Sequence, residues 1–213
     1  MKVVTSAVMA QQIILQGGGA FTANDELDSR VLAEYPGYVA VLPTAEAFEN
    51  PDELIADCQA WAKRLGATIK ICAVYTRADA REESFAQIVA DAGSVYVVGD
   101  SPIHLRSTLK DTVVFSAVAN HQCVVANAGS AAAMCDPMVD PRGGAFALGL
   151  GLVQGIAVIT ESEKWSDDRL HRTLGLANTS VAEIPTGAAL IRNEQKWSTD
   201  GTVILHGPLP TNR

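Results

Sequence analysis

A single serine stands among small residues where an apolar strand is expected to end. The stretch reads Cys123-Val-Val-Ala-Asn-Ala-Gly-Ser130-Ala-Ala-Ala-Met-Cys135, with a glycine before the serine and three alanines after it. Small neighbours are typical of a sharp strand-to-helix turn, because a strained and crowded backbone tolerates little bulk. The pattern predicts that Ser130 lies on such a turn, at a strained or positive φ, with its hydroxyl presented as a nucleophile. The alternative is a tight turn in which Ser130 only caps the next helix.

Strands and helices alternate along the chain, and these elements must position the serine. Apolar runs predict strands at 13–16, 38–42, 68–74, 95–98 and 122–126, and helical spacing predicts helices at 23–34, 51–65, 80–92 and 103–119. Strands joined by such helices form a parallel sheet with right-handed crossovers. A later strand at 156–159 and a helix at 167–176 precede strand-like runs at 188–192 and 203–206. The sequence predicts one α/β domain over residues 1–213, a doubly wound, mostly parallel sheet with a C-terminal antiparallel edge.

Glycine-rich or polar turns follow several of the predicted strands. In open α/β sheets ligands bind at the carboxyl edge, so the turns at 17–19, 43–45 and 99–101 should converge with Ser130 on one crevice. The backbone N–H of Ala131 and the turn at Gly99 would then supply donors for an oxyanion. The predicted binding residues are Gly18, Gly19, Gly99, Asp100, Ser101 and Ala131.

Five segments, in order across nearly the whole chain, resemble the S51 serine peptidases, the family of dipeptidase E and cyanophycinase. They are Gly17-Gly18-Gly19, Leu42-Pro-Thr-Ala45, Val98-Gly99-Asp100, Ala128-Gly-Ser-Ala-Ala-Ala133, and Gly149-Leu-Gly-Leu152 with the downstream Arg169-Leu170. The resemblance implies a flavodoxin-like fold of the class I glutamine amidotransferase type. It also implies a serine hydrolase or peptidase function with Ser130 as the nucleophile.

The chain departs from the family pattern where a base is needed. The family has a histidine after the strand that follows Gly-Leu-Gly-Leu, whereas this chain reads Thr160-Glu161-Ser162. The resemblance therefore places Glu161 at the position of the base, and a carboxylate is a weak base at neutral pH. His104, His121, His171 and His206 are interpreted as packing or surface residues. Since a serine needs a base within hydrogen-bond reach, we expect weak or lost catalysis.

Two other classes of function stay open at this point. The first is a non-catalytic protein that binds a small ligand or peptide at the strand-to-helix turn of Ser130, which we call the elbow, or that serves as an oligomer subunit. The second is a nucleotide or phosphate binder that uses the Gly17–Gly19 turn, although the G-x-G-x-x-G spacing and a following Lys-Ser/Thr are missing.

Composition limits the partners. A net charge of −8 argues against nucleic acid and anionic membranes, and the four scattered cysteines form no zinc or redox motif. We expect no metal and no cofactor. The expected partner is a small peptide or a carboxylate-bearing small molecule, with a homodimer as a further possibility. A signal pattern and a membrane-length apolar run are both missing, which predicts a cytoplasmic protein.

Overall fold

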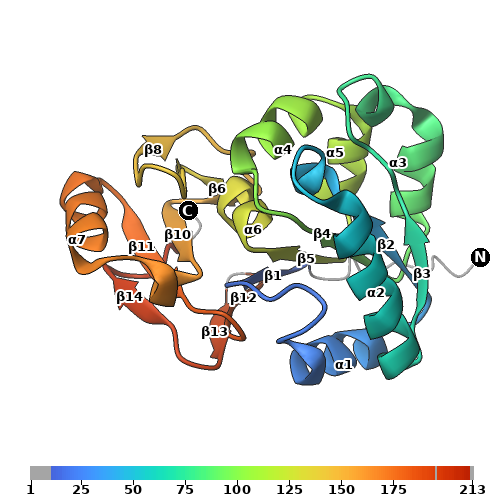
Figure 1. The fold of residues 1–213 in the computed structure, drawn as a ribbon, viewed down its shortest axis with the longest axis horizontal. Helices are drawn as coiled ribbons and strands as arrows, with labels where there is room; N and C mark the ends of the chain where they lie inside the picture. The colour runs from blue at the N-terminus through green and yellow to red at the C-terminus, as the bar shows by residue number, and fades with distance from the viewer. Residues whose placement is uncertain (1–10, 195, 212–213) are drawn as a thin grey trace, which may run out of the picture.

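A seven-stranded sheet of order β13-β12-β1-β5-β4-β2-β3 forms the centre of the computed structural model, which describes residues 11–194 and 196–211 (Figure 1). The parallel strands are β1 (Gln12–Gln16), β2 (Tyr38–Leu42), β3 (Thr68–Ile71), β4 (Ser94–Val97) and β5 (Cys123–Asn127). Strands β12 (Ala189–Asn193) and β13 (Lys196–Asp200) add an antiparallel edge beside β1. The predicted α/β fold with a mostly parallel sheet is confirmed.

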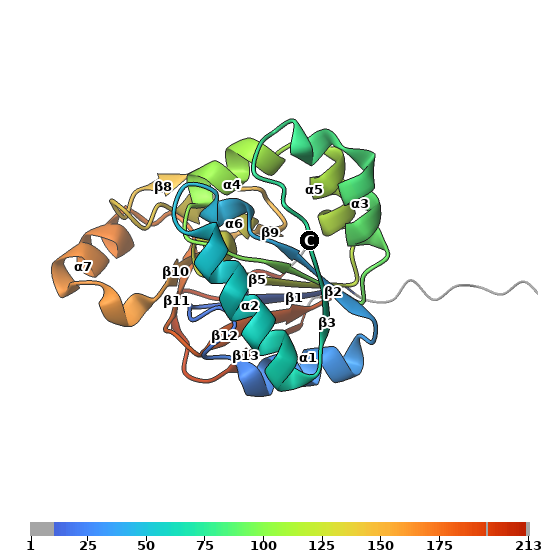
Figure 2. The ribbon, with the colours of Figure 1, turned by 45° about the vertical axis from the view of Figure 1, so that its right-hand side comes forward.

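Helices cover both faces of this sheet (Figure 1, Figure 2). Helices α1 (Asp25–Glu34) and α2 (Pro51–Leu65) pack on one face, where Trp61 and Tyr96 are buried. The other face carries α3 (Glu83–Ala90), α4 (Pro102–Leu109), α5 (Val113–Ala119) and α6 (Gly129–Met134). Helix α2 ends as predicted at Gly66, which takes the left-handed conformation with φ 68°.

The helix predicted at 103–119 is interrupted. Helix α4 ends at Leu109, and α5 begins at Val113 after Asp111, whose φ is 58°. Thr112 caps α5, because its hydroxyl accepts a hydrogen bond from the Phe115 N–H at 3.3 Å. Within the described ranges, no helix has both the length and the apolar character needed to cross a bilayer.

A second sheet projects from one side of the molecule (Figure 1). It has the order β10-β11-β14, from β10 (Ile156–Thr160), β11 (Ser180–Ile184) and β14 (Ile204–His206), and α7 (Asp167–Leu176) packs against it. Two short pairs, β6 (Cys135–Asp136) with β9 (Val153–Gln154) and β7 (Met138–Val139) with β8 (Phe146–Ala147), lie between α6 and β10 in the chain.

The expectation that residues 203–206 join the edge of the main sheet is wrong. Strand β14 pairs antiparallel with β11, and the polar strand β13 takes the edge position beside β12. Burial explains the exchange: β13 is largely exposed, as an edge strand can be, whereas β10 and most of β11 are buried apolar strands that need partners of their own.

Candidate functional site

The turn after β5 has the sharp geometry expected of it, but the strained residue is Ala128. This alanine has φ 52° and ψ −126°, a combination that L residues rarely adopt. Its N–H donates to the Gln16 carbonyl at 3.1 Å, which ties the turn to the end of β1. The expectation of a strained or positive φ at Ser130 is therefore wrong. The chain reverses directly after the strand, and Ser130 already has helical backbone in α6.

Ser130 is fully buried, and its hydroxyl is used inside the structure. Both the N–H and the hydroxyl of Ser130 donate to the Gly99 carbonyl, at 3.0 Å and 3.2 Å. Gly129 makes this approach possible, because a Cβ there would lie 2.3 Å from the Asp100 carbonyl oxygen. The turns after β4 and β5 are thus packed together, with Ser130 as the connection between them.

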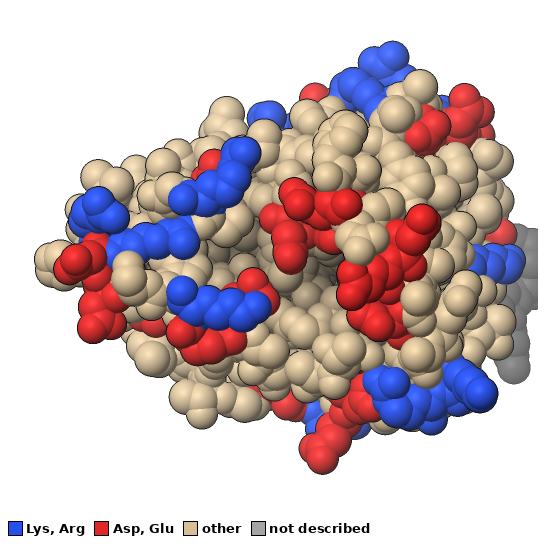
Figure 3. All heavy atoms as spheres, in the orientation of Figure 1, with Lys and Arg blue, Asp and Glu red and all other residues tan. Residues whose placement is uncertain are grey.

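A cavity of about 180 Å³ lies at this carboxyl edge, between the main sheet and the second sheet; we call it the charged cavity. Its lining residues are Asp100, Gly129, Pro141, Thr160, Glu161, Lys164, Trp165 and Arg169. Figure 3 shows the molecule hollowed between a side rich in Lys and Arg and a side rich in Asp and Glu. Of the residues predicted from the sequence, Asp100 and Glu161 line the cavity. The other predicted site residues are not among those that line it: Gly18, Gly19, Gly99, Ser101, Ser130 and Ala131.

Glu161 joins the charged cavity to the glycine-rich turn after β1. It follows β10 in the left-handed conformation (φ 48°, ψ 42°), and its N–H donates to the Gly17 carbonyl at 2.9 Å. A Cβ on Gly18 would lie 2.7 Å from Cγ of Glu161, so the missing side chain at Gly18 makes room for the glutamate. Lys164 Nζ donates to the Glu161 carboxylate at 2.6 Å. The turns after β1 and β10 therefore meet at this edge.

Asp100 faces the charged cavity from the turn after β4. Its carboxylate has no hydrogen bond or ion pair within residues 11–194 and 196–211, although its backbone N–H donates to Glu46 at 3.3 Å. Partial withdrawal from water and the nearby carboxylates of Glu161 and Glu46 raise the pKa of Asp100, and Lys164 opposes them. Asp100 is thus an exposed acid on the cavity wall that has no hydrogen-bond or ion-pair partner among the described residues.

Arg169 of α7 contributes a positive charge to the lining of the cavity. Its guanidinium carbon lies 3.7 Å from the centre of the Trp165 ring, which holds the planar group in place without using its N–H donors. Its Nε and Nη2 atoms are buried and have no hydrogen-bond partner among the described residues. Asp140 interacts electrostatically with Arg169, but the ion pair that it forms is with Arg142, at 3.1 Å. Arg169 therefore lines the cavity and also has buried donors that no described residue uses.

The sequence analysis assigned no role to Lys164, Trp165 or Arg169. A signal was present, because Trp165 stands directly before Ser166, the N-cap of α7, and Arg169 lies in the first turn of that helix. Ser166 caps that helix by accepting a hydrogen bond from the Arg169 N–H, which fixes the first turn. These residues follow the expected base position rather than coinciding with it, so the family pattern does not mark them as a site.

The four histidines lie away from the charged cavity. His104 and His121 bond to backbone carbonyls, at 2.9–3.0 Å. His206 pairs with a carboxylate in the second sheet, and His171 is exposed on α7. In the part of the chain that the structure describes, no histidine bonds to Ser130, whose hydroxyl donates to a carbonyl instead.

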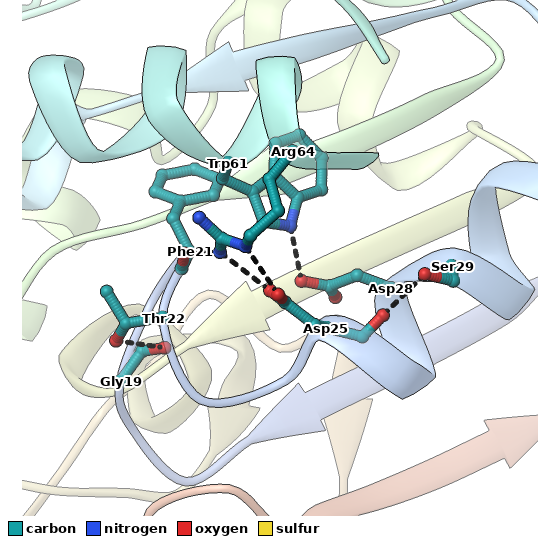
Figure 4. A network of polar contacts seen from close by, with 8 residues as sticks. All are labelled: Gly19, Phe21, Thr22, Asp25, Asp28, Ser29, Trp61 and Arg64. Atoms are coloured by element: carbon teal, nitrogen blue, oxygen red, sulfur yellow. Dashed lines mark hydrogen bonds and ion pairs between the residues drawn. The ribbon is translucent and has the colours of Figure 1, made fainter. Parts of the chain in front are cut away.

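A buried polar network lies beneath the turns, and Figure 4 shows one of its hydrogen bonds, from Trp61 to Asp28. Gln16 and Asn127 end β1 and β5, and Asn127 Nδ2 donates to Gln16 Oε1 at 2.9 Å. Gln16 Nε2 donates in turn to Asp28 at 2.8 Å, and Tyr96 and Trp61 donate to the same carboxylate at 3.0 Å each. Burial raises the pKa of Asp28 to about 6, while the three donors act in the opposite direction. The network connects both turns to the core under α1 and α2.

Other hollows lack this combination of charges. One of about 430 Å³ lies at the amino edge beside His121, and one of about 660 Å³ lies beside Arg192; neither is lined by an acid. Within the described ranges, no three His, Cys, Asp or Glu side chains are grouped so that they would hold a metal ion. The charged cavity is also the hollow that adjoins the elbow of β5.

Comparison with known proteins shows the fold. No protein-family model matches the chain, and no curated protein matches it. A peptidase from an acI-B1 Actinobacterium is similar in structure, with a TM-score of 0.82 and 22% identity over 96% of this chain and 93% of that one. A putative peptidase E from Listeria monocytogenes EGD-e has a TM-score of 0.68 and 13% identity over 90% of this chain and 98% of that one. The chain therefore has the fold of these two proteins, in agreement with the fold that the resemblance implies.

Proposed function

We propose that this protein binds a small carboxylate-bearing molecule in the charged cavity and does not perform the serine chemistry of the fold it shares. The observation that carries the proposal is Arg169, which lines the cavity and whose buried Nε and Nη2 atoms have no hydrogen-bond partner among the described residues. Leaving a buried charged donor unpaired is costly, and a carboxylate offers two acceptors that match the planar guanidinium. A carboxylate is therefore the ligand group that best completes this site.

The elbow supports binding without covalent catalysis. Its strained residue, Ala128, has no hydroxyl, and the nearby Ser130 hydroxyl donates to the Gly99 carbonyl. Glu161, at the position where the family has its base, is paired with Lys164 at 2.6 Å. A serine mechanism needs a free nucleophile beside a free base, and the two act as a unit. The proposal is thus a pseudoenzyme that keeps the crevice of the fold as a binding site.

Peptidase-type hydrolysis is the second candidate. It is favoured by the two structural neighbours, which are both described as peptidases. On this alternative Ser130 would have to leave Gly99 and meet a base at the cavity, so turnover would depend on Ser130. The two candidates are separated by the labelling experiment that closes the Discussion.

Phosphate binding at the glycine-rich turn is disfavoured by its contacts. The Gly17 N–H donates to the Ala188 carbonyl at 2.9 Å, so it is not free to bind an anion. Glu161 packs its side chain over Gly18, and its negative charge would repel a phosphate there. The turn instead fits the role of a support for Glu161.

The proposal is tested with Arg169→Gln and with Arg172→Gln, an exposed arginine on the same helix, as the matched control. The probes are N-acetyl amino acids and their methyl esters, titrated calorimetrically. Wild type and Arg172→Gln should bind the acids in preference to the esters, and Arg169→Gln should lose about tenfold or more in affinity for the acids. Equal binding by Arg169→Gln, with its fold verified by circular dichroism, would contradict the proposal.

A further inference from the structure

Two charges of opposite sign line the charged cavity without partners. Arg169 has unused buried donors, and the Asp100 carboxylate has no hydrogen bond or ion pair among the described residues. These two side chains do not pair with each other either, since none of the ion pairs within the described ranges joins them. The cavity therefore presents one negative and one positive site to the same small volume.

The other charges at the cavity are already matched. Lys164 and Glu161 form an ion pair with each other at 2.6 Å. Glu46, which lies behind Asp100, accepts hydrogen bonds from the backbone N–H groups of Asn50 and Asp100, both at 3.3 Å. A ligand with a carboxylate alone would pair with Arg169 and leave the exposed Asp100 carboxylate to water. A ligand that also carries a cation would complete both.

The cavity is of the size of a single amino acid. Its volume of about 180 Å³ equals the share of roughly six water molecules in the liquid, at about 30 Å³ each. An amino acid is the smallest common metabolite class that carries an ammonium and a carboxylate on a short frame. An ammonium also suits Asp100 on electrostatic grounds, because the carboxylates of Glu161 and Glu46 act on the same wall, where only Lys164 opposes them.

We infer that the ligand of the charged cavity is a free amino-acid zwitterion, whose ammonium is held by Asp100 and whose carboxylate is held by Arg169. The inference rests on the proposed function, because it needs Arg169 to bind the carboxylate. It goes beyond that function by requiring the ammonium. Lys164 and Glu161 remain paired in the complex, and Trp165 keeps the guanidinium in its plane.

The test compares matched ligands by isothermal titration calorimetry. The probes are the standard L-α-amino acids, β-alanine and 4-aminobutanoate, each with its N-acetyl derivative, which lacks the ammonium, and its methyl ester, which lacks the carboxylate. At least one free amino acid should bind about tenfold more tightly than both of its derivatives. β-Alanine and 4-aminobutanoate carry the two groups at increasing separation and report the spacing that the site prefers.

Two variants test which side chain binds the ammonium of the ligand and which binds its carboxylate. Asp100→Asn should lower the affinity for the free amino acid to that of its N-acetyl derivative and leave the N-acetyl derivative unchanged. Arg169→Gln should weaken both. Asp91→Asn, at the end of α3, is the matched control and should change neither.

The outcomes separate the inference from the function on which it rests. N-acetyl derivatives that bind as tightly as the free amino acids, with binding lost in Arg169→Gln, would overturn the zwitterion and keep the carboxylate site. Esters that bind as well as acids, or no saturable binding of any probe up to roughly 10 mM, would overturn both.

Discussion

Glu161 packs against Gly18 so closely that no side chain fits at position 18. A Cβ there would lie 2.7 Å from Cγ and 3.1 Å from a carboxylate oxygen of Glu161. Gly18 follows the first strand of the main sheet, and Glu161 follows the first strand of the second sheet. This contact, together with the hydrogen bond from the Glu161 N–H to Gly17, joins the two sheets at the edge of the charged cavity.

Gly18→Ala should therefore destabilise the protein. Overpacking of a tight contact costs about 1–3 kcal/mol, and the cost should shrink when Glu161→Ala is made in the same chain. Chemical denaturation of the two single variants and the double variant measures this coupling. Gly143→Ala is the control, because a Cβ there meets nothing within 4 Å. Additive effects of Gly18→Ala and Glu161→Ala would show that the contact does not hold the two sheets together.

Asp28 should make stability depend on pH. Burial raises the pKa of Asp28 from 3.8 to about 6, so the folded state keeps a proton that the unfolded chain has lost. Its contribution to the free energy of unfolding is therefore complete below about pH 4 and is lost as pH rises through 6, by about 3 kcal/mol at most. Urea denaturation of wild type and Asp28→Asn across this range gives the difference. A difference that does not change with pH would contradict the raised pKa.

Ser130→Ala should change stability slightly and ligand binding not at all. The variant loses the hydroxyl hydrogen bond to the Gly99 carbonyl, which is still bonded to the N–H of residue 130. We expect a loss of about 0.5–1.5 kcal/mol in the free energy of unfolding. Ser107→Ala, which removes an exposed hydroxyl on α4, serves as the control. A large fall in the affinity for free amino acids in Ser130→Ala would place Ser130 in the site.

Binding of free amino acids should weaken on acidification. An ammonium needs Asp100 in its ionised form, and the raised pKa of Asp100 means that it becomes protonated at a higher pH than an ordinary aspartate. Titrations from about pH 8 down to the ordinary aspartate pKa, about 4, should show falling affinity for free amino acids and less change for their N-acetyl derivatives. Asp100→Asn should remove this difference. Parallel pH profiles for the two ligand types in wild type would contradict the role of Asp100.

The sequence predicted the sheet well because its strands are strongly apolar and are separated by amphipathic helices. It did not predict which small residue of Ala128-Gly129-Ser130 takes the strained conformation, since alanine carries no sign of a positive φ. The end of the apolar run at Asn127 was the usable signal, because the sharp turn follows the strand directly. The interruption at Asp111 was likewise marked by Thr112, a good capping residue inside a pattern that otherwise reads as one helix.

The site was only partly predictable for a different reason. Asp100 follows β4, and its place at the carboxyl edge follows from the parallel topology of the main sheet. Glu161 follows β10 of the second sheet, so its approach to that edge depends on how the two sheets pack. Arg169 and Trp165 come from the second sheet and its helix, and their approach depends on how that sheet packs against the first. That packing is set by close backbone contacts such as Gly18 with Glu161, which no periodicity records.

The most direct measurement asks whether any serine of this protein reacts as a nucleophile. Purified wild type and Ser130→Ala are treated with a fluorophosphonate probe, and the intact mass of each is measured, with a serine protease in the same sample as a positive control. We predict no covalent adduct on either protein, because the strained elbow residue is Ala128 and the Ser130 hydroxyl is bonded to Gly99. An adduct on wild type that disappears in Ser130→Ala would contradict the account and establish a serine hydrolase.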